Sequence, residues 1–219
     1  MDDPHQSTAK ARTQHLKRVL NAGSGSRKAR PLHALFMREA WQEVRIDINP
    51  MVNPDVVGSI TDMNSAFPAQ SFDAVWSSHI LEHLHAHEVP LALGEFKRIL
   101  KPDGFALITC PDIEAVAAFI VEHGLDSVAY ISPAGPIAGL DLLFGHSTSI
   151  ARGQFYMAHK TGFTCASLGQ LLLDTGFSTV LAKRERFDLW ALALTEQADK
   201  PLLQEQLAKA GLDMFEHAT

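Results

Sequence analysis

The sequence predicts an α/β fold with a mainly parallel sheet, helices on both faces and an antiparallel hairpin near the C-terminal end. Short apolar runs alternate with segments of helical periodicity, which is typical of βαβ units. A glycine-rich turn, Gly23-Ser24-Gly25, follows the first apolar run directly. Near the end, two strand-like runs over 178–186 and 188–195 have almost no gap between them. Only antiparallel strands can be joined so tightly, because a parallel crossover needs a dozen or more residues.

Five apolar runs in the first half of the chain are expected strands. In order, they are Val19–Ala22, Glu43–Ile48, Asp55–Ile60, Phe72–Ser77 and Phe105–Cys110. The third run is the weakest because Gly58 interrupts it. The fifth follows a Lys-Pro-Asp-Gly turn at 101–104 and ends at Pro111.

The segments between these runs are expected to be helical. We expect a first helix directly after the glycine turn. Further helices are expected at Val89–Leu100, Ile113–His123, Thr164–Thr175 and Leu202–Ala210. Pro90 suits a first helical turn, where its missing N–H costs nothing, and Gly176 suits the position just past a helix end.

The chain divides into a polar lead-in over 1–17, one domain over 18–196 and a C-terminal tail over 197–219. Between Pro111 and Lys160 the connection is longer than an ordinary crossover, so an insertion at about 111–162 is expected to form a lid or substrate wall. It offers five side chains for substrate contact: Tyr130, His146, Arg152, Phe155 and Tyr156.

Composition excludes several classes of protein. The 219 residues suffice for one sizeable α/β domain, and the net charge of -6 argues against a non-specific nucleic-acid binder. No apolar run reaches the ~18 residues of a membrane span, and the polar N-terminus lacks the apolar core of a secretory signal. Cys110 and Cys165 are interpreted as reduced thiols, with a single disulfide left open. We therefore expect a cytoplasmic protein without a membrane or nucleic-acid partner, and leave a homodimer open.

The turn Leu20–Ser26 suits a ligand with an anionic group. Glycine lets the backbone lie against a ligand, and the amides of a following helix would favour negative charge. Asp47 ends the second expected strand ~20 residues later, where an acid typically binds a ribose diol. Asp62 and Met63, past the third strand, could bond an adenine amino group and pack on its ring. Each has a plain structural alternative. The glycines could form a simple tight turn, Asp47 could be a surface carboxylate, and Asp62 could be a turn or cap residue.

The stretch His79–His83 satisfies H-x-x-E-H, a pattern of inverted zinc peptidases. That chemistry needs both histidines on one face of an established helix, with a further ligand downstream. His79 instead follows the strand Phe72–Ser77 and is expected in a loop at the carboxyl edge of the sheet, where open α/β sheets bind ligands. The zinc reading is therefore disfavoured, and no metal is expected.

In their order and spacing, these segments resemble the class I S-adenosylmethionine-dependent methyltransferases. More narrowly, they resemble small bacterial predicted methyltransferases with LN-x-GSG and SSH-x-LEHL segments. The matching stretches are 20–25, 45–47, 59–63, 67–68, 71–83 and 95–104, within a resemblance that covers roughly 18–195. It implies a Rossmann-like, doubly wound sheet of seven strands and S-adenosylmethionine as cofactor. The chain departs from the family at Asn21, where an acid is usual, and at Arg27, where a third glycine is frequent.

The resemblance also implies site residues. Those expected to bind the cofactor are Asn21, Gly23, Ser24, Gly25, Asp47, Ile48, Asp62, Met63, Ser77 and Ser78. His79 would face the methyl group or the substrate. A hydroxyl or amine acceptor must lose a proton, and His79 and His159 are the candidates to accept it, since histidine titrates near neutrality. A structural role for each is at least as strongly indicated.

The function predicted is methyl transfer to a small-molecule or glycan-type acceptor. The alternative is a non-catalytic cofactor-binding module of the same fold, which Asn21 and Arg27 favour. A nicotinamide oxidoreductase is disfavoured because Lys28 stands where G-x-G-x-x-G needs its third glycine. The sequence does not indicate the acceptor.

Overall fold

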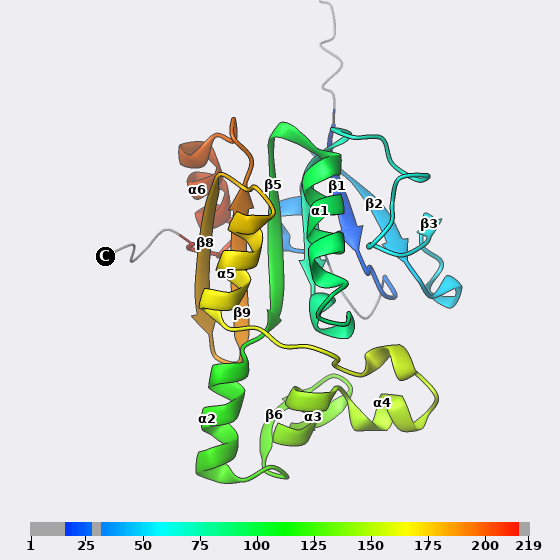
Figure 1. Ribbon diagram of the computed structural model, residues 1–219, viewed down its shortest axis with the longest axis vertical. Coiled ribbons are helices and arrows are strands. Elements are labelled where there is room, and N and C mark those ends of the chain that lie inside the picture. The colour runs from blue at the N-terminus through cyan, green and yellow to red at the C-terminus, as the bar shows by residue number, and fades with distance from the viewer. Residues whose placement is uncertain (1–15, 28–31, 215–219) are drawn as a thin grey trace, which may run out of the picture.

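A computed structural model describes residues 16–27 and 32–214 and shows one seven-stranded sheet in the order β3-β2-β1-β4-β5-β9-β8 (Figure 1). Its strands are β1 (Lys17–Ala22), β2 (Trp41–Asp47), β3 (Val56–Val57), β4 (Phe72–Ser78), β5 (Leu100–Pro111), β8 (Thr179–Glu185) and β9 (Asp188–Leu194). The predicted fold class is confirmed. Strand β3 is much shorter than the expected 55–60: its pairing with β2 ends at Val57, and the N–H of Gly58 makes the last bond, to the Asp47 carbonyl.

Five strands of this sheet run parallel, and the C-terminal hairpin adds the expected antiparallel pairing. Strand β1 pairs in parallel with β2 and β4, and β4 with β5. Strand β9 is antiparallel to both β5 and β8, so it lies between them while β8 forms the edge. The carboxyl ends of β1, β2 and β4 therefore lie at one edge of the sheet, where the turns after them can meet.

The helices are α1 (Val89–Ile99), α2 (Ile113–His123), α3 (Gly139–Phe144), α4 (Ser147–Ala151), α5 (Cys165–Asp174) and α6 (Lys200–Lys209). Short 3-10 turns are η1 (Ala34–Phe36), η2 (Pro50–Val52), η3 (Leu81–His83) and η4 (Phe155–Met157). The Thr164 side chain caps α5. The predicted helix after the glycine turn is wrong for the described residues, since only η1 lies between β1 and β2 there.

Helices cover both faces of the sheet, as predicted (Figure 1). On one face, α1 and α5 pack against the sheet with Phe96 and Leu172 among their buried side chains. On the other face, η1 and α6 pack through Phe36 and Leu207 against side chains that include Trp76. Helix α6 therefore belongs to the core and is not a loose tail.

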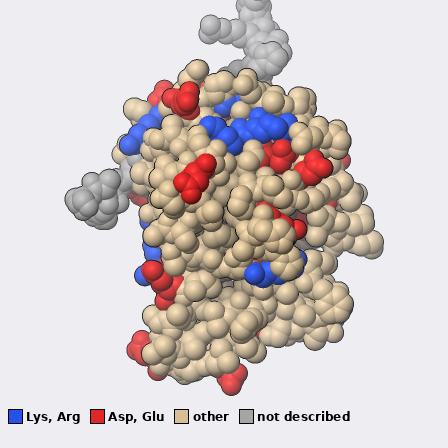
Figure 2. Space-filling model, viewed as in Figure 1, with Lys and Arg blue, Asp and Glu red and all other residues tan. Residues whose placement is uncertain are grey.

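The insertion forms a small layer beyond one end of the sheet, built from α2, α3, α4 and the hairpin of β6 (Val128–Ser132) and β7 (Gly135–Ala138) (Figure 1). It has its own minor core around Val116, Ile137 and Leu142. Charged side chains are sparse on this lower part of the molecule in the view of Figure 2.

The polar lead-in up to residue 15 and the last five residues lie outside the described residues. Cys110 and Cys165 are both free thiols, which leaves no disulfide between them. In the described ranges, no helix combines the length and the apolar character that crossing a bilayer requires.

Candidate functional site

The glycine turn after β1 adopts a backbone that only glycine takes easily. Gly23 and Gly25 have φ of +61° and +56°, in the left-handed region. A Cβ added to Gly23 would lie 2.3 Å from Cδ1 of Ile80, in the loop after β4. The turn therefore packs directly against that neighbouring loop.

Asp47 ends β2 and fastens this turn from the neighbouring strand. Its Oδ2 accepts the N–H of Gly25 at 2.8 Å, and its Oδ1 accepts the N–H of Asn49 at 2.9 Å. A carboxylate has about four acceptor positions, so Asp47 can accept from a ligand as well. The expected meeting of turn and carboxylate at one sheet edge is present.

Buried Arg45, which was not among the expected site residues, supports the same edge. Its side chain is 1% exposed and donates to the carbonyls of Gly25 and Asn53, the latter at 2.7 Å. The position of an arginine within an expected strand was the sequence feature that could have indicated this role. It ties the glycine turn to the loop between β2 and β3 and so shapes the site from below.

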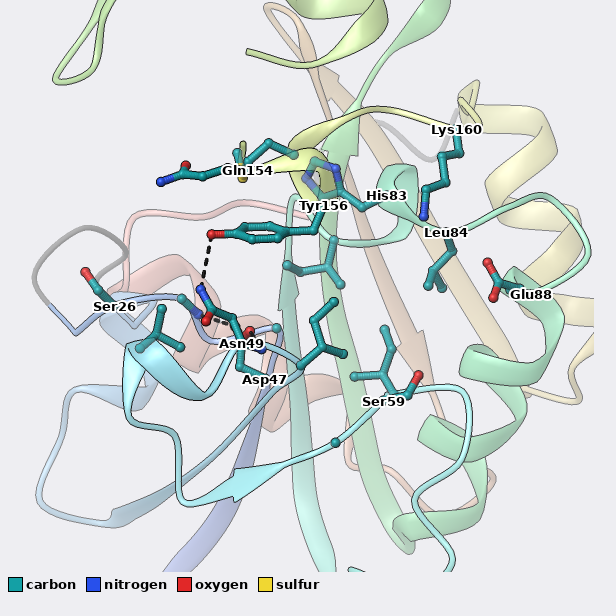
Figure 3. Close-up of a pocket in the computed structure, with 18 residues that line it drawn as sticks. Ser26, Asp47, Asn49, Ser59, His83, Leu84, Glu88, Gln154, Tyr156 and Lys160 are labelled. Atoms are coloured by element: carbon teal, nitrogen blue, oxygen red, sulfur yellow. Dashed lines mark hydrogen bonds between the residues drawn. The ribbon is translucent and has the colours of Figure 1, made fainter. Parts of the chain in front are cut away.

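A cavity of about 500 Å³ opens above this turn (Figure 3). Its walls come from the turn, the ends of β2 and β3, the loop after β4 and the insertion. Its lining residues are Gly23, Gly25, Ser26, Asp47, Ile48, Asn49, Val52, Gly58, Ser59, Ile60, Ile80, His83, Leu84, Glu88, Gln154, Tyr156, Met157 and Lys160. The volume suits a medium-sized organic ligand.

Four predicted cofactor residues line the cavity: Gly23, Gly25, Asp47 and Ile48. Asn21 does not, because its amide donates to Glu43 Oε1 at 2.7 Å. Arg27 donates to the other oxygen of the same carboxylate at 3.2 Å. The two departures from the family pattern thus share one partner on β2.

Asp62 and Met63 lie outside the cavity. Asp62 is exposed, and its carboxylate accepts the N–H of Asn64, which is a turn role. Met63 is fully buried in the core, and its N–H donates to Glu95 Oε2 at 2.6 Å. Residues 58–60 occupy the wall where the pair was expected, because β3 ends at Val57, before the expected end at Ile60.

The predicted serines lie beneath the cavity surface. Ser24 and Ser77 are buried, and neither hydroxyl has a hydrogen-bond partner among the described residues. The Ser78 hydroxyl accepts from Thr109 Oγ1 at 3.1 Å. Unpartnered buried hydroxyls are rare in proteins, and here Ser24 lies within the glycine turn and Ser77 near the end of β4.

His79 lies past β4 with φ of +52° and does not line the cavity. Its ring is within 3.3 Å of a Glu82 oxygen and 3.6 Å of an Asp188 oxygen. Burial lowers the pKa of His79, but the two carboxylates outweigh it and raise the pKa to about 10. The two carboxylates thus favour the charged imidazolium, which makes His79 poorly suited to accept a proton.

His159 also lies behind the cavity wall, against His83, with their ring centroids 5.1 Å apart. Burial lowers the pKa of His159. His83 itself lines the cavity, although it was not among the expected site residues.

The insertion closes the cavity from above. Tyr156 of η4 faces the loop after β2, and its hydroxyl accepts from Asn49 Nδ2 at 3.1 Å (Figure 3). Gln154, Met157 and Lys160 join it on the wall. The expectation that the insertion supplies a wall fits this geometry; of its five candidate contact residues, only Tyr156 lines the cavity.

Comparisons with known proteins agree with the fold. The family profile described as a methyltransferase domain matches residues 20–108. Among curated proteins, none matches the sequence.

Three solved structures illustrate the likeness. A SAM-dependent methyltransferase from Archaeoglobus fulgidus is 16% identical with a TM-score of 0.54, over 83% of this chain and 87% of that one. The Burkholderia thailandensis 1,6-didemethyltoxoflavin-N1-methyltransferase, solved with 1,6-didemethyltoxoflavin and S-adenosylhomocysteine, is 17% identical with a TM-score of 0.51, over 84% and 72%. A possible histamine N-methyltransferase from Thermotoga maritima is 13% identical with a TM-score of 0.52, over 82% of each chain. At such identities the shared property is the fold.

Proposed function

We propose that this protein, with a methyltransferase-domain match and a class I methyltransferase fold, transfers a methyl group from S-adenosylmethionine to a small-molecule acceptor. The match and the fold indicate S-adenosylmethionine as the cofactor. The small-molecule acceptor is inferred from the size of the cavity and from neighbours whose names specify small substrates.

The observation that carries the proposal is Asp47 beside the glycine turn, on the wall of one cavity. Its carboxylate is already oriented by two backbone amides, so it can accept ribose hydroxyls without losing freedom on binding. The glycine turn offers a surface without side chains next to it. Apolar Ile48, Val52 and Ile60 supply a wall suited to an adenine ring.

The chain's own task in such a reaction is alignment and exclusion of water. The cofactor supplies a methyl group already activated by a sulfonium. The insertion covers the cavity through Tyr156 and Met157, which reduces access of water to the acceptor. Ile80 and Leu84 add apolar surface on the side of the loop after β4.

We assign His79 and His159 as positioning residues, because neither lines the cavity. Charged His79 holds Glu82 and Asp188, which ties the loop after β4 to the start of β9. Any proton acceptor for the substrate is then sought among the titratable residues on the wall, which include His83, Glu88 and Lys160.

Isothermal titration calorimetry with S-adenosylmethionine and S-adenosylhomocysteine tests the cofactor assignment. We expect saturable binding of both, and NADH serves as the negative control. An absence of binding at millimolar cofactor, in protein shown to be folded by circular dichroism, would refute the proposal. Turnover on a panel of small hydroxyl and amine acceptors and on glycans then tests the acceptor class.

A further inference from the structure

Three side chains at the edge of the cavity form a compact donor set. Glu82, His83 and His159 each offer one ligand atom, and these atoms all lie within 4.8 Å of one another. Two come from η3, and the third from the segment between η4 and α5, far along the sequence. His83 also faces the cavity (Figure 3).

The Glu82 carboxylate is buried, with the residue 1% exposed, and its oxygens have no hydrogen-bond partner among the described residues. Its ion pair with His79, at 3.3 Å, reaches one oxygen only. His79 therefore compensates one oxygen in part, while the other has no partner among the described residues, and a bound cation is one of the few partners that can complete the compensation of a buried carboxylate.

Both histidine rings are held by backbone carbonyls. Nδ1 of His83 is 3.1 Å from the Ala158 oxygen, and Nδ1 of His159 is 3.1 Å from the Leu142 oxygen. A carbonyl only accepts, so each Nδ1 carries a hydrogen, and in the neutral ring Nε2 then carries the lone pair. Metal-binding histidines in proteins usually have this arrangement, which fixes both tautomer and ring direction.

The backbone assembles this cluster without an ion. The N–H of Lys160 donates to the Glu82 carbonyl at 2.8 Å, and the N–H of His159 donates to the Phe144 carbonyl at 3.1 Å. Gly145 has φ of +92°, and a Cβ there would lie 2.0 Å from the Met157 oxygen, so α3 and η4 approach closely only because it is glycine. The fold thus brings the distant His159 to η3.

We propose that Glu82, His83 and His159 bind one divalent transition-metal ion, with Zn²⁺ as the best match. Two imidazoles and a carboxylate are a donor set that zinc favours, with bonds of about 2.0–2.2 Å, so binding draws the ligand atoms together by about 1 Å. Three protein ligands leave one position open, and His83 places the ion at the edge of the cavity.

This site differs from the one that the H-x-x-E-H pattern denotes. That pattern would use His79 and His83 on one helix, whereas here His79 pairs with Asp188 and Glu82, and His159 takes its place as the second imidazole. The metal site is independent of the cofactor assignment, because its ligands are identified without reference to Asp47 or the glycine turn.

The test uses full-length protein freed of metal with a chelator, then titrated with zinc chloride by calorimetry and assayed by elemental analysis after dialysis. We expect one zinc per chain in the wild type. His159→Gln and Glu82→Gln should each weaken binding by at least about 10- to 100-fold. The control, His85→Gln/His87→Gln, removes two exposed histidines of the same stretch and should bind zinc like the wild type.

Circular dichroism and S-adenosylhomocysteine titration accompany each protein. Cofactor binding is measured on metal-free protein, so that the metal site and the proposed function can fail independently of each other. No zinc in the wild type, or equal zinc in folded His159→Gln and wild type, would overturn the metal site. Loss of zinc in the His85→Gln/His87→Gln control alone would show that zinc binds to the surface histidines, and this result would also overturn the metal site.

Discussion

Replacing Asp47 tests the central geometry of the cofactor site. In Asp47→Ala, the amides of Gly25 and Asn49 lose a charged acceptor at 2.8 and 2.9 Å. Hydrogen bonds to charged groups contribute about 1.5–3 kcal/mol each when buried, but Asp47 is half-buried and water can reach the freed amides. We therefore expect a loss of about 2 kcal/mol in the free energy of unfolding.

The same substitution should also weaken cofactor binding. If the carboxylate accepts the ribose hydroxyls, its removal costs about 1.5–3 kcal/mol of binding free energy, or about 10- to 150-fold in Kd for S-adenosylhomocysteine. Asp47→Asn keeps one oxygen acceptor without the charge, so its affinity should lie between those of wild type and Asp47→Ala. This order separates the ligand contact from simple loss of the turn.

Calorimetry with S-adenosylhomocysteine measures Kd, and urea unfolding measures stability. Asp62→Ala is the matched control, because that carboxylate is exposed and lies outside the cavity. It should bind within about twofold of the wild type. The reasoning is refuted if folded Asp47→Ala binds as tightly as the wild type, and more so if Asp62→Ala is the variant that loses affinity.

Three further substitutions, with Gly94→Ala as a control, probe the turn, the core and the cavity wall. Gly23→Ala forces a left-handed alanine against the loop after β4, so it should lower the free energy of unfolding by about 1–2 kcal/mol and abolish cofactor binding. In the same urea titrations, Gly94→Ala should raise the free energy of unfolding by about 0.5–1 kcal/mol, because the space around Gly94 is open. The hydrogen bond from the Arg98 guanidinium outweighs burial and lowers the pKa of Glu95 below its ordinary 4.5. The ionised Glu95 therefore stabilises the fold above pH 4.5, and this stabilisation is lost as the pH falls through the folded-state pKa. Glu95→Gln should therefore unfold more readily at neutral pH and show a flatter acid limb, and an unchanged stability–pH profile would contradict this. Tyr156→Ala removes a cavity wall and should raise the Kd for S-adenosylhomocysteine or the KM for an acceptor by about tenfold, and unchanged constants would remove Tyr156 from the site.

Local chemistry made several elements predictable. The helix at 113–123 has the predicted bounds, because Asp112 caps it and Gly124 ends it. The close spacing of 178–186 and 188–195 permitted only a hairpin. Asp47 could be placed beside the glycine turn because β1 and β2 are parallel neighbours whose carboxyl ends share one edge.

Other residues depend on contacts that no local pattern contains. Met63 appeared suited to a ligand but is buried against the core, where Glu95 accepts its N–H. His79 appeared to be a proton acceptor, yet Asp188, distant in sequence, is among the groups that keep it charged.

The sequence by itself determined the alternation of strands and helices, the antiparallel end and the glycine turn, because periodicity and turn chemistry act over a few residues. Tertiary structure alone decided which side chains surround the cavity and that His159 meets Glu82 and His83. Those meetings depend on how the insertion folds back on η3, and that packing joins residues whose separation along the chain carries no periodic signal.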